Sequence, residues 1–123
     1  MKYLLLLYGG DLPEPQPGTP EFDQMMQAYS DFNDLLDRDG ITWAGEALHD
    51  VSDATSVRRR NGRIDTMDGP FAETKEQLGG YYLIDVPDLE TAIRYAGEIP
   101  AVNYGTVEVR PVMDVDTLLK GAG

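Results

Sequence analysis

The 123-residue sequence contains no cysteine and a single histidine, His49. The absence of cysteine excludes disulfide bonds, thiolate metal ligands and cysteine nucleophiles. Long hydrophobic runs are also missing, because the apolar run from Tyr3 to Tyr8 is too short for a signal-peptide core or a membrane span. We therefore expect a cytoplasmic protein without membrane contacts.

Basic residues are scarce. Ten lysines and arginines stand against 22 aspartates and glutamates, which gives a formal net charge of −12. Such a chain repels nucleic acids over most of its surface, so no direct nucleic-acid binding is expected. Its one basic cluster, residues 58–60 with Arg63, lies in a predicted hairpin. The cluster is therefore interpreted as a solvated tip, with a nucleic-acid site as the less favoured alternative.

At this length we expect one domain, residues 1–123. Apolar residues at spacings of three and four predict a helix that begins at the cap Thr19 and the first-turn Pro20, and ends at Gly40. A second helix is predicted after Pro87-Asp88. Asn61-Gly62 suits a two-residue hairpin turn that places Arg58 opposite Asp65 and Arg59 opposite Ile64. Main strands are predicted over residues 2–8, 41–48, 79–86 and 106–112, with a Pro-rich loop over about 10–20 and a peripheral tail over about 114–123.

The predicted order is β-α-β, hairpin, β-α-β, which is typical of an α+β, ferredoxin-like fold with an antiparallel sheet. Both helices of that fold cover one face of the sheet. The first strand is nevertheless apolar on both sides, as is the strand containing Tyr81 and Tyr82. An antiparallel strand with one face in water alternates apolar with polar residues, so the open face must be covered. The cover is either the same face of a second chain, giving a homodimer, or the Pro-rich loop.

The stretch DGPFAETKEQLGGYYLID, residues 68–85, joins the hairpin to a main strand. A turn aspartate normally accepts a bond from the residue two positions on, but Pro70 has no N–H. We therefore expect Asp68 to bond another donor, with a side chain left free for another partner as the alternative. We expect Phe71 to insert into the core and to hold Glu73, Lys75 and Glu76 as a site. The alternative is a charged loop that ends in a bulge at Gly79-Gly80.

The same stretch resembles the signature of the YCII-related domain family, in its DGPFAETKE (DGPF) branch. MKYLLLLYG, GGYYLIDVPDLETAIRYAGEIPA and GTVEVRPV also resemble strands and a helix of that family. The resemblance implies ferredoxin-like protomers that pair into a dimeric α+β barrel. It further implies that some relatives are cofactor-independent lyases or isomerases acting on cyclic metabolites, and that genes of this branch often lie beside extracytoplasmic-function sigma factors.

This chain departs from the family pattern at its histidines. Some relatives carry a catalytic histidine on the first helix, which is absent here, and many place one just before the closing strand, where this chain has Tyr104. His49 is followed by Asp50 and is interpreted as a surface residue more readily than as a base. No ligand spacing predicts a metal site.

The leading hypothesis is a cofactor-independent lyase or isomerase that acts on a small cyclic metabolite by proton transfer from a carboxylate beside Lys75. The alternative is a non-catalytic ligand-binding or regulatory module associated with a sigma factor. We expect a ligand cleft between the sheet and its dimer partner. The candidate catalytic residues are Asp68, Glu73, Lys75 and Glu76. The candidate substrate-binding residues are Trp43, His49, Phe71, Tyr81, Tyr82 and Tyr104.

Overall fold

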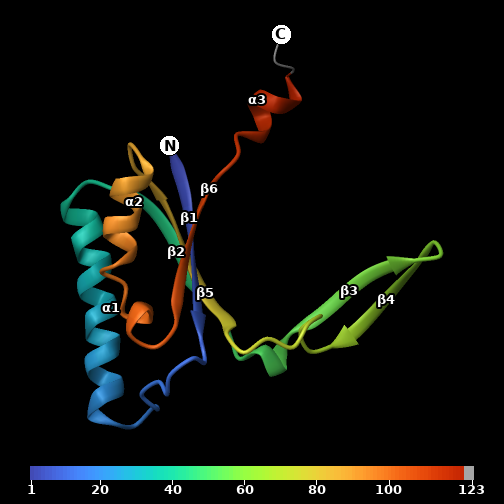
Figure 1. Ribbon diagram of the computed structural model, residues 1–123, viewed down its shortest axis with the longest axis horizontal. Coiled ribbons are helices and arrows are strands. Elements are labelled where there is room, and N and C mark those ends of the chain that lie inside the picture. The colour runs from blue at the N-terminus through green and yellow to red at the C-terminus, as the bar shows by residue number, and fades with distance from the viewer. Residues whose placement is uncertain (121–123) are drawn as a thin grey trace.

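The computed structural model describes residues 1–120 and consists of a four-stranded sheet, helices on one of its faces and a separate two-stranded hairpin (Figure 1). The main strands are β1 (Lys2–Gly9), β2 (Thr42–Ala47), β5 (Gln77–Asp85) and β6 (Thr106–Pro111). The hairpin strands are β3 (Thr55–Arg60) and β4 (Arg63–Asp68). The α-helices are α1 (Pro20–Arg38), α2 (Leu89–Ala96) and α3 (Val115–Leu119), and the short 3₁₀ turns are η1 (Val51–Asp53) and η2 (Pro100–Asn103).

The main sheet has the order β2-β5-β1-β6, and each neighbouring pair is antiparallel. In the picture α1 and α2 lie together on one side of this sheet (Figure 1). The architecture is α+β and is consistent with the ferredoxin-like fold predicted from the order of elements.

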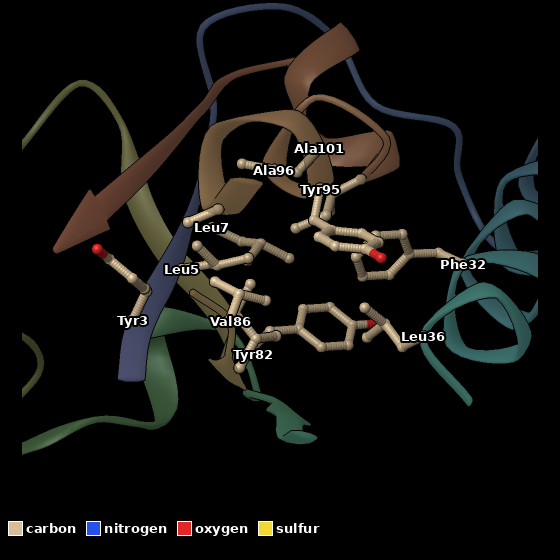
Figure 2. Packing of buried hydrophobic residues seen from close by; sticks show 13 residues of the cluster. Tyr3, Leu5, Leu7, Phe32, Leu36, Tyr82, Val86, Tyr95, Ala96 and Ala101 are labelled. Atoms are coloured by element: carbon tan, nitrogen blue, oxygen red, sulfur yellow. The ribbon is translucent and has the colours of Figure 1, made fainter. Parts of the chain in front are cut away.

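The core lies between the sheet and the two long helices (Figure 2). Leu5 and Ile84 from the central strands and Leu36 from α1 are fully buried in it. Tyr82 packs edge-on against Phe32, with the ring centroids 5.1 Å apart, and its hydroxyl donates to Asn33 Oδ1 over 2.7 Å. The tyrosine thus fills the core with its ring while its polar end has a partner.

The helix boundaries follow the capping residues. The Thr19 hydroxyl accepts from the backbone N–H of Phe22, and Pro20 occupies the first turn of α1, as predicted. The Asp88 carboxylate caps α2 in the same way through Thr91 N.

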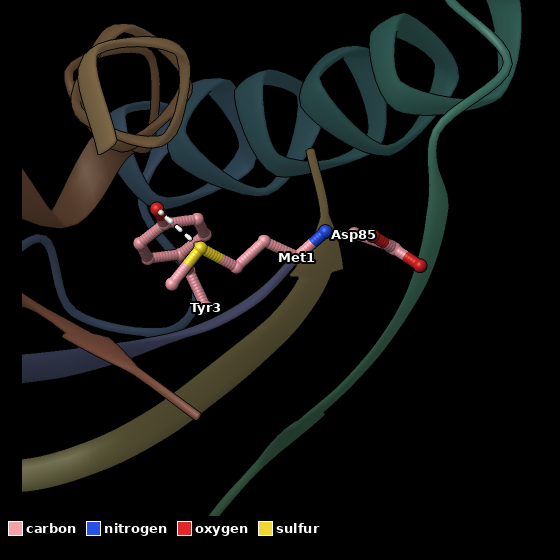
Figure 3. A network of polar contacts seen from close by, with 3 residues as sticks. All are labelled: Met1, Tyr3 and Asp85. Atoms are coloured by element: carbon pink, nitrogen blue, oxygen red, sulfur yellow. Dashed lines mark hydrogen bonds and ion pairs between the residues drawn. The ribbon is translucent and has the colours of Figure 1, made fainter. Parts of the chain in front are cut away.

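The first residue of the chain is bonded where β1 starts and β5 finishes. The amino group of Met1 binds Asp85 Oδ1 at 2.9 Å, and the Tyr3 hydroxyl donates to the Met1 sulfur (Figure 3).

The open face of the sheet is apolar in the middle and polar at its edges. Cross-strand pairing places Leu6 beside Tyr81 and Leu4 beside Leu83. These half-buried side chains point away from the helices, opposite to the buried set of Leu5 and its neighbours. The edge strands contribute polar residues to the same face, Glu46 from β2 and Glu108 and Arg110 from β6. The prediction that the central strands are apolar on both sides is confirmed.

The Pro-rich loop does not cover this face. Its Leu12 N–H donates to the Tyr104 carbonyl over 2.9 Å, which ties the loop to η2 at the end of the sheet. In the picture the loop runs beneath α1, on the helix side (Figure 1). The prediction that this loop folds over the open face, the alternative to a second chain, is therefore wrong.

The β3–β4 hairpin forms a sheet of its own and extends as an arm from the open side of the domain (Figure 1). Asn61 and Gly62 adopt positive φ values of 51° and 76°, as a type I′ turn requires. Arg58 pairs with Asp65 and Arg59 with Ile64, which confirms the predicted register. Nearly every residue of the arm is exposed.

The chain beyond β6 leaves the sheet at the end opposite to the arm. Residues 112–116 lie beside Met1, Lys2 and Asp85, and α3 follows with all five residues exposed. Of the predicted tail, 114–123, the last three residues lie outside the described range. Within residues 1–120, no helix combines the length and the apolar character needed to cross a membrane.

Candidate functional site

A cleft of about 750 Å³ lies at the end of the sheet where β1 finishes and β5 begins, and we call it the end cleft. Its walls come from the loop after β1, from α1, from the segment after β2 and from the first residues of β5. The polar side chains that line it are those of Tyr8, Asp11, Glu14, Tyr29, His49, Asp50 and Gln77. Concave sites of this size with a few convergent polar groups are where small molecules usually bind.

Two glycines allow the loop after β1 to carry carboxylates into this cleft. Gly10 has φ +106°, and a Cβ built there would lie 2.8 Å from the Lys75 carbonyl oxygen, so a side chain is excluded by both conformation and space. The Glu14 carboxylate lies against Gly9, where an added Cβ would collide with it. Asp11 and Glu14, which follow these glycines, both line the cleft.

Tyr29 extends from α1 into the same cleft. Partial burial raises the pKa of its phenol to about 12, with smaller contributions from Tyr82 and the Glu14 carboxylate. The phenol therefore stays protonated at neutral pH. This part of the cleft combines proton acceptors with a neutral hydrogen-bond donor.

The DGPFAETKE segment approaches the cleft through its last two charges. Lys75 Nζ lies 3.2 Å from Asp11 Oδ1, and Glu76 Oε1 accepts from the Thr106 hydroxyl over 2.9 Å. Residues 71–76 form bends rather than a helix or strand. At Gly79 the β1–β5 register shifts, so that Leu7 pairs with Gly80 and Tyr8 with Leu78. A bulge at Gly79-Gly80 was expected by the charged-loop alternative. The Gly79 carbonyl accepts from Leu48 N.

Two expectations for this segment are wrong. Phe71 does not insert into the core, because 74% of it is exposed. The hydrogen bonds of residues 1–120 include none to the Asp68 side chain; instead Asp68 pairs with Thr55 at the base of the hairpin. The neighbouring contacts involve Gly69 instead: its N–H donates to the Ala54 carbonyl, and its carbonyl accepts from the Ser56 hydroxyl. Glu73 is exposed.

The predicted aromatic residues divide between three places. Tyr82 lies in the core, and Trp43 packs on it while its indole N–H donates to Asp37 Oδ1 over 2.8 Å. Tyr81 lies on the open face. Tyr104 is half-buried after η2, where its carbonyl holds the Pro-rich loop.

His49 is the one predicted residue that lines the end cleft. It is almost fully exposed, and its Nδ1 lies 4.0 Å from Asp53 Oδ2. The adjacent Asp50 caps η1, and hydrogen bonds from Ser52 lower the pKa of its carboxyl. In the part of the chain that the structure describes, no three histidine, aspartate or glutamate side chains gather in a way that could hold a metal ion.

Sequence reasoning missed Asp11, Glu14 and Tyr29. Asp11 and Glu14 belong to the Pro-rich loop, which was considered only as a cover, and Tyr29 belongs to the apolar stripe of α1. The available signal was Gly9-Gly10 directly after a buried strand, because paired glycines at that place mark a close backbone approach.

Two comparisons with known proteins bear on this site. The model of the YCII-related domain matches residues 1–116, and the chain therefore belongs to the YCII-related family. An uncharacterized protein of Rhizobium meliloti (strain 1021) is 33% identical over 114 residues, which cover 91% of this chain and 92% of that protein.

Proposed function

We propose that this protein is a cofactor-independent lyase or isomerase that moves a proton on a small cyclic carbonyl compound bound in the end cleft. The observation that carries the proposal is that the Glu14 carboxylate and the Tyr29 phenol line the same cleft, where Glu14 acts electrostatically on the phenol. An ionised carboxylate accepts a proton, and a phenol with a pKa of about 12 donates a hydrogen bond without losing its own.

The reaction would begin with transfer of a proton from the carbon beside the carbonyl to Glu14, while Tyr29 Oη–H donates to the enolate oxygen. Return of the same proton to a different carbon completes an isomerisation, and departure of a leaving group from the β carbon completes an elimination. Asp11 and its partner Lys75 would bind a polar substituent of the substrate. The sequence hypothesis assigned proton transfer to a carboxylate among Asp68, Glu73 and Glu76, beside Lys75. We propose Glu14 for that role instead, and Asp11, the ion-pair partner of Lys75, for positioning.

We further propose that two copies pair through their open faces into a dimeric α+β barrel, in keeping with the DGPF branch. The support is the apolar centre and polar edge of that face, the distribution typical of protein interfaces. Light scattering at micromolar concentration should report twice the mass of 13.6 kDa. A monomer would contradict the barrel.

The catalytic proposal is tested by screening cyclic ketones and lactones for binding by ligand-observed NMR, and then following exchange of the proton beside the carbonyl in D₂O. Glu14→Gln should keep binding and lose exchange, and Tyr29→Phe should slow exchange. Glu21→Gln, a change in the first turn of α1, is the matched control and should behave as wild type. If compounds bind but none of them exchanges its proton, the non-catalytic binding module is favoured instead.

A further inference from the structure

The β3–β4 arm and the α3 segment share an unusual property, since both extend beyond the domain and expose apolar side chains. On the arm, Val57 and Ile64 are 61% and 55% exposed. On α3, Val115, Leu118 and Leu119 are 52%, 57% and 79% exposed. These residues recur at spacings of three and four, so they form one stripe along the helix.

Val57 and Ile64, the two most exposed apolar residues of the arm, share one face. The register pairs Val57 with Thr66 and Ile64 with Arg59, and residues two apart in a strand lie on the same side. One face of the arm therefore presents Val57 and Ile64 together with Arg59. The other face is more polar, because it carries Arg58, Arg60, Arg63 and Asp65 beside a single apolar residue, Met67.

The two extensions leave the sheet at opposite ends. The arm begins where β5 begins, next to the contact between Leu48 and Gly79. The α3 segment begins beside Met1 and Asp85, where β1 starts and β5 finishes. Both project to the side away from α1, so a second copy seated on the open face would lie between them (Figure 1).

Length and charge determine which parts can meet. Packed sheets lie about 10 Å apart, and a six-residue antiparallel strand spans about 20 Å, so the arm reaches past a partner sheet. The arm carries four arginines and two aspartates, whereas the segment from Val112 to Leu119 carries Asp114 and Asp116 and no basic residue. Opposite charge thus favours contact of an arm with an α3 segment, and disfavours contact of two arginine-rich arms.

From these observations we propose that the two copies of the dimer clasp each other reciprocally: the Val57–Ile64 face of each arm packs on the Val115–Leu118–Leu119 stripe of the partner, and Arg59 meets Asp116 beside it. The clasp rests on the proposed pairing of open faces. It requires a twofold axis across the strands, because only that axis brings opposite ends of the two sheets together.

The cysteine-free chain allows a direct test. Chains carrying Ile64→Cys are mixed with differently tagged chains carrying Leu118→Cys, dissociated and reassociated, and oxidised with copper phenanthroline. The clasp predicts a disulfide-linked dimer that contains both tags. Asp65→Cys on the polar face of the arm is the matched control and should not cross-link to Leu118→Cys.

Two results would overturn the clasp while leaving the dimer intact. One is a dimer by light scattering in which residues 64 and 118 do not cross-link. The other is cross-linking of Ile64→Cys chains with each other, which would place the two arms side by side. A monomer by light scattering would instead refute the paired faces on which the clasp depends.

Charge reversal gives an independent measurement on the uncross-linked protein. Arg59→Glu should weaken dimerisation by about tenfold or more, the effect of about 1.4 kcal/mol, and Asp116→Arg in the same chain should restore it. Restoration would not occur if Arg59→Glu acted only by disturbing the hairpin. Absence of restoration would therefore contradict the pairing of Arg59 with Asp116.

Discussion

Lys75 Nζ lies 3.2 Å from Asp11 Oδ1, and this ion pair joins the DGPFAETKE segment to the loop after β1. Both side chains are substantially exposed, so the pair contributes little to the folding free energy. Its consequence is positional, because it fixes a charged group at the rim of the end cleft. The segment therefore borders the candidate site without forming its floor.

Lys75→Ala should weaken ligand binding while changing the melting temperature very little. Loss of an exposed ion pair costs about 0–1 kcal/mol, whereas Asp11 would lose the partner that holds it at the rim. Calorimetric titration with a compound identified by NMR screening and thermal unfolding measure the two effects. Glu21→Gln, a change in the first turn of α1, serves as the control. Equal affinity of wild type and Lys75→Ala would show that the pair plays no part in binding.

Alkaline pH should destabilise the protein partly through Tyr29. Its pKa in the folded state, about 12, lies above the ordinary value of 10.0, so the folded protein holds the phenolic proton more tightly than the unfolded chain. This contribution is complete below pH 10 and is lost as the pH rises from 10 to 12. Urea unfolding across that range should show a smaller loss for Tyr29→Phe than for wild type. Tyr82 and Tyr95, whose pKa values are also raised, remain in both proteins, so parallel pH profiles would contradict the assignment.

Leu36→Ala should be strongly destabilising. Leu36 is fully buried between α1 and the sheet, and truncation of such a leucine costs about 2–5 kcal/mol through lost burial and the cavity left behind. Ile93→Ala on α2 is the control, because Ile93 is 55% exposed and its truncation should cost only about 0.5 kcal/mol. Urea unfolding at a fixed protein concentration compares them. Similar midpoints for the two variants would contradict the packing shown in Figure 2.

Gly62→Val should distort the arm and leave the domain folded. Gly62 has φ +76°, which a β-branched residue adopts only with strain, but the hairpin is a separate sheet. The free energy of unfolding should fall by much less than about 3 kcal/mol, the size of a core truncation. Amide chemical shifts of β3 and β4 should move while those of β1 and β5 remain. A core-sized loss would mean that the arm is integral to the main fold.

The features that could be predicted from the sequence are those encoded by near neighbours. The hairpin register follows from Asn61-Gly62, the limits of α1 follow from Thr19 and Gly40, and the two-faced character of β1 follows from its alternation. The exposure of Phe71 could not be predicted in this way. An aromatic residue after a rigid turn is of a type that often packs into a core. Whether Phe71 can reach the core depends on the direction in which the arm leaves the sheet.

The sequence by itself determined the order of strands and helices, the turn of the arm and the presence of an apolar open face, because periodicity and turn chemistry act over a few residues. Only the tertiary structure decided where a ligand cleft lies. Asp11, Tyr29 and His49 are far apart along the chain and carry no shared local pattern. They line one cleft because the end of β1, the inner face of α1 and the segment after β2 converge at the same end of the sheet, and that convergence is a property of the packed chain.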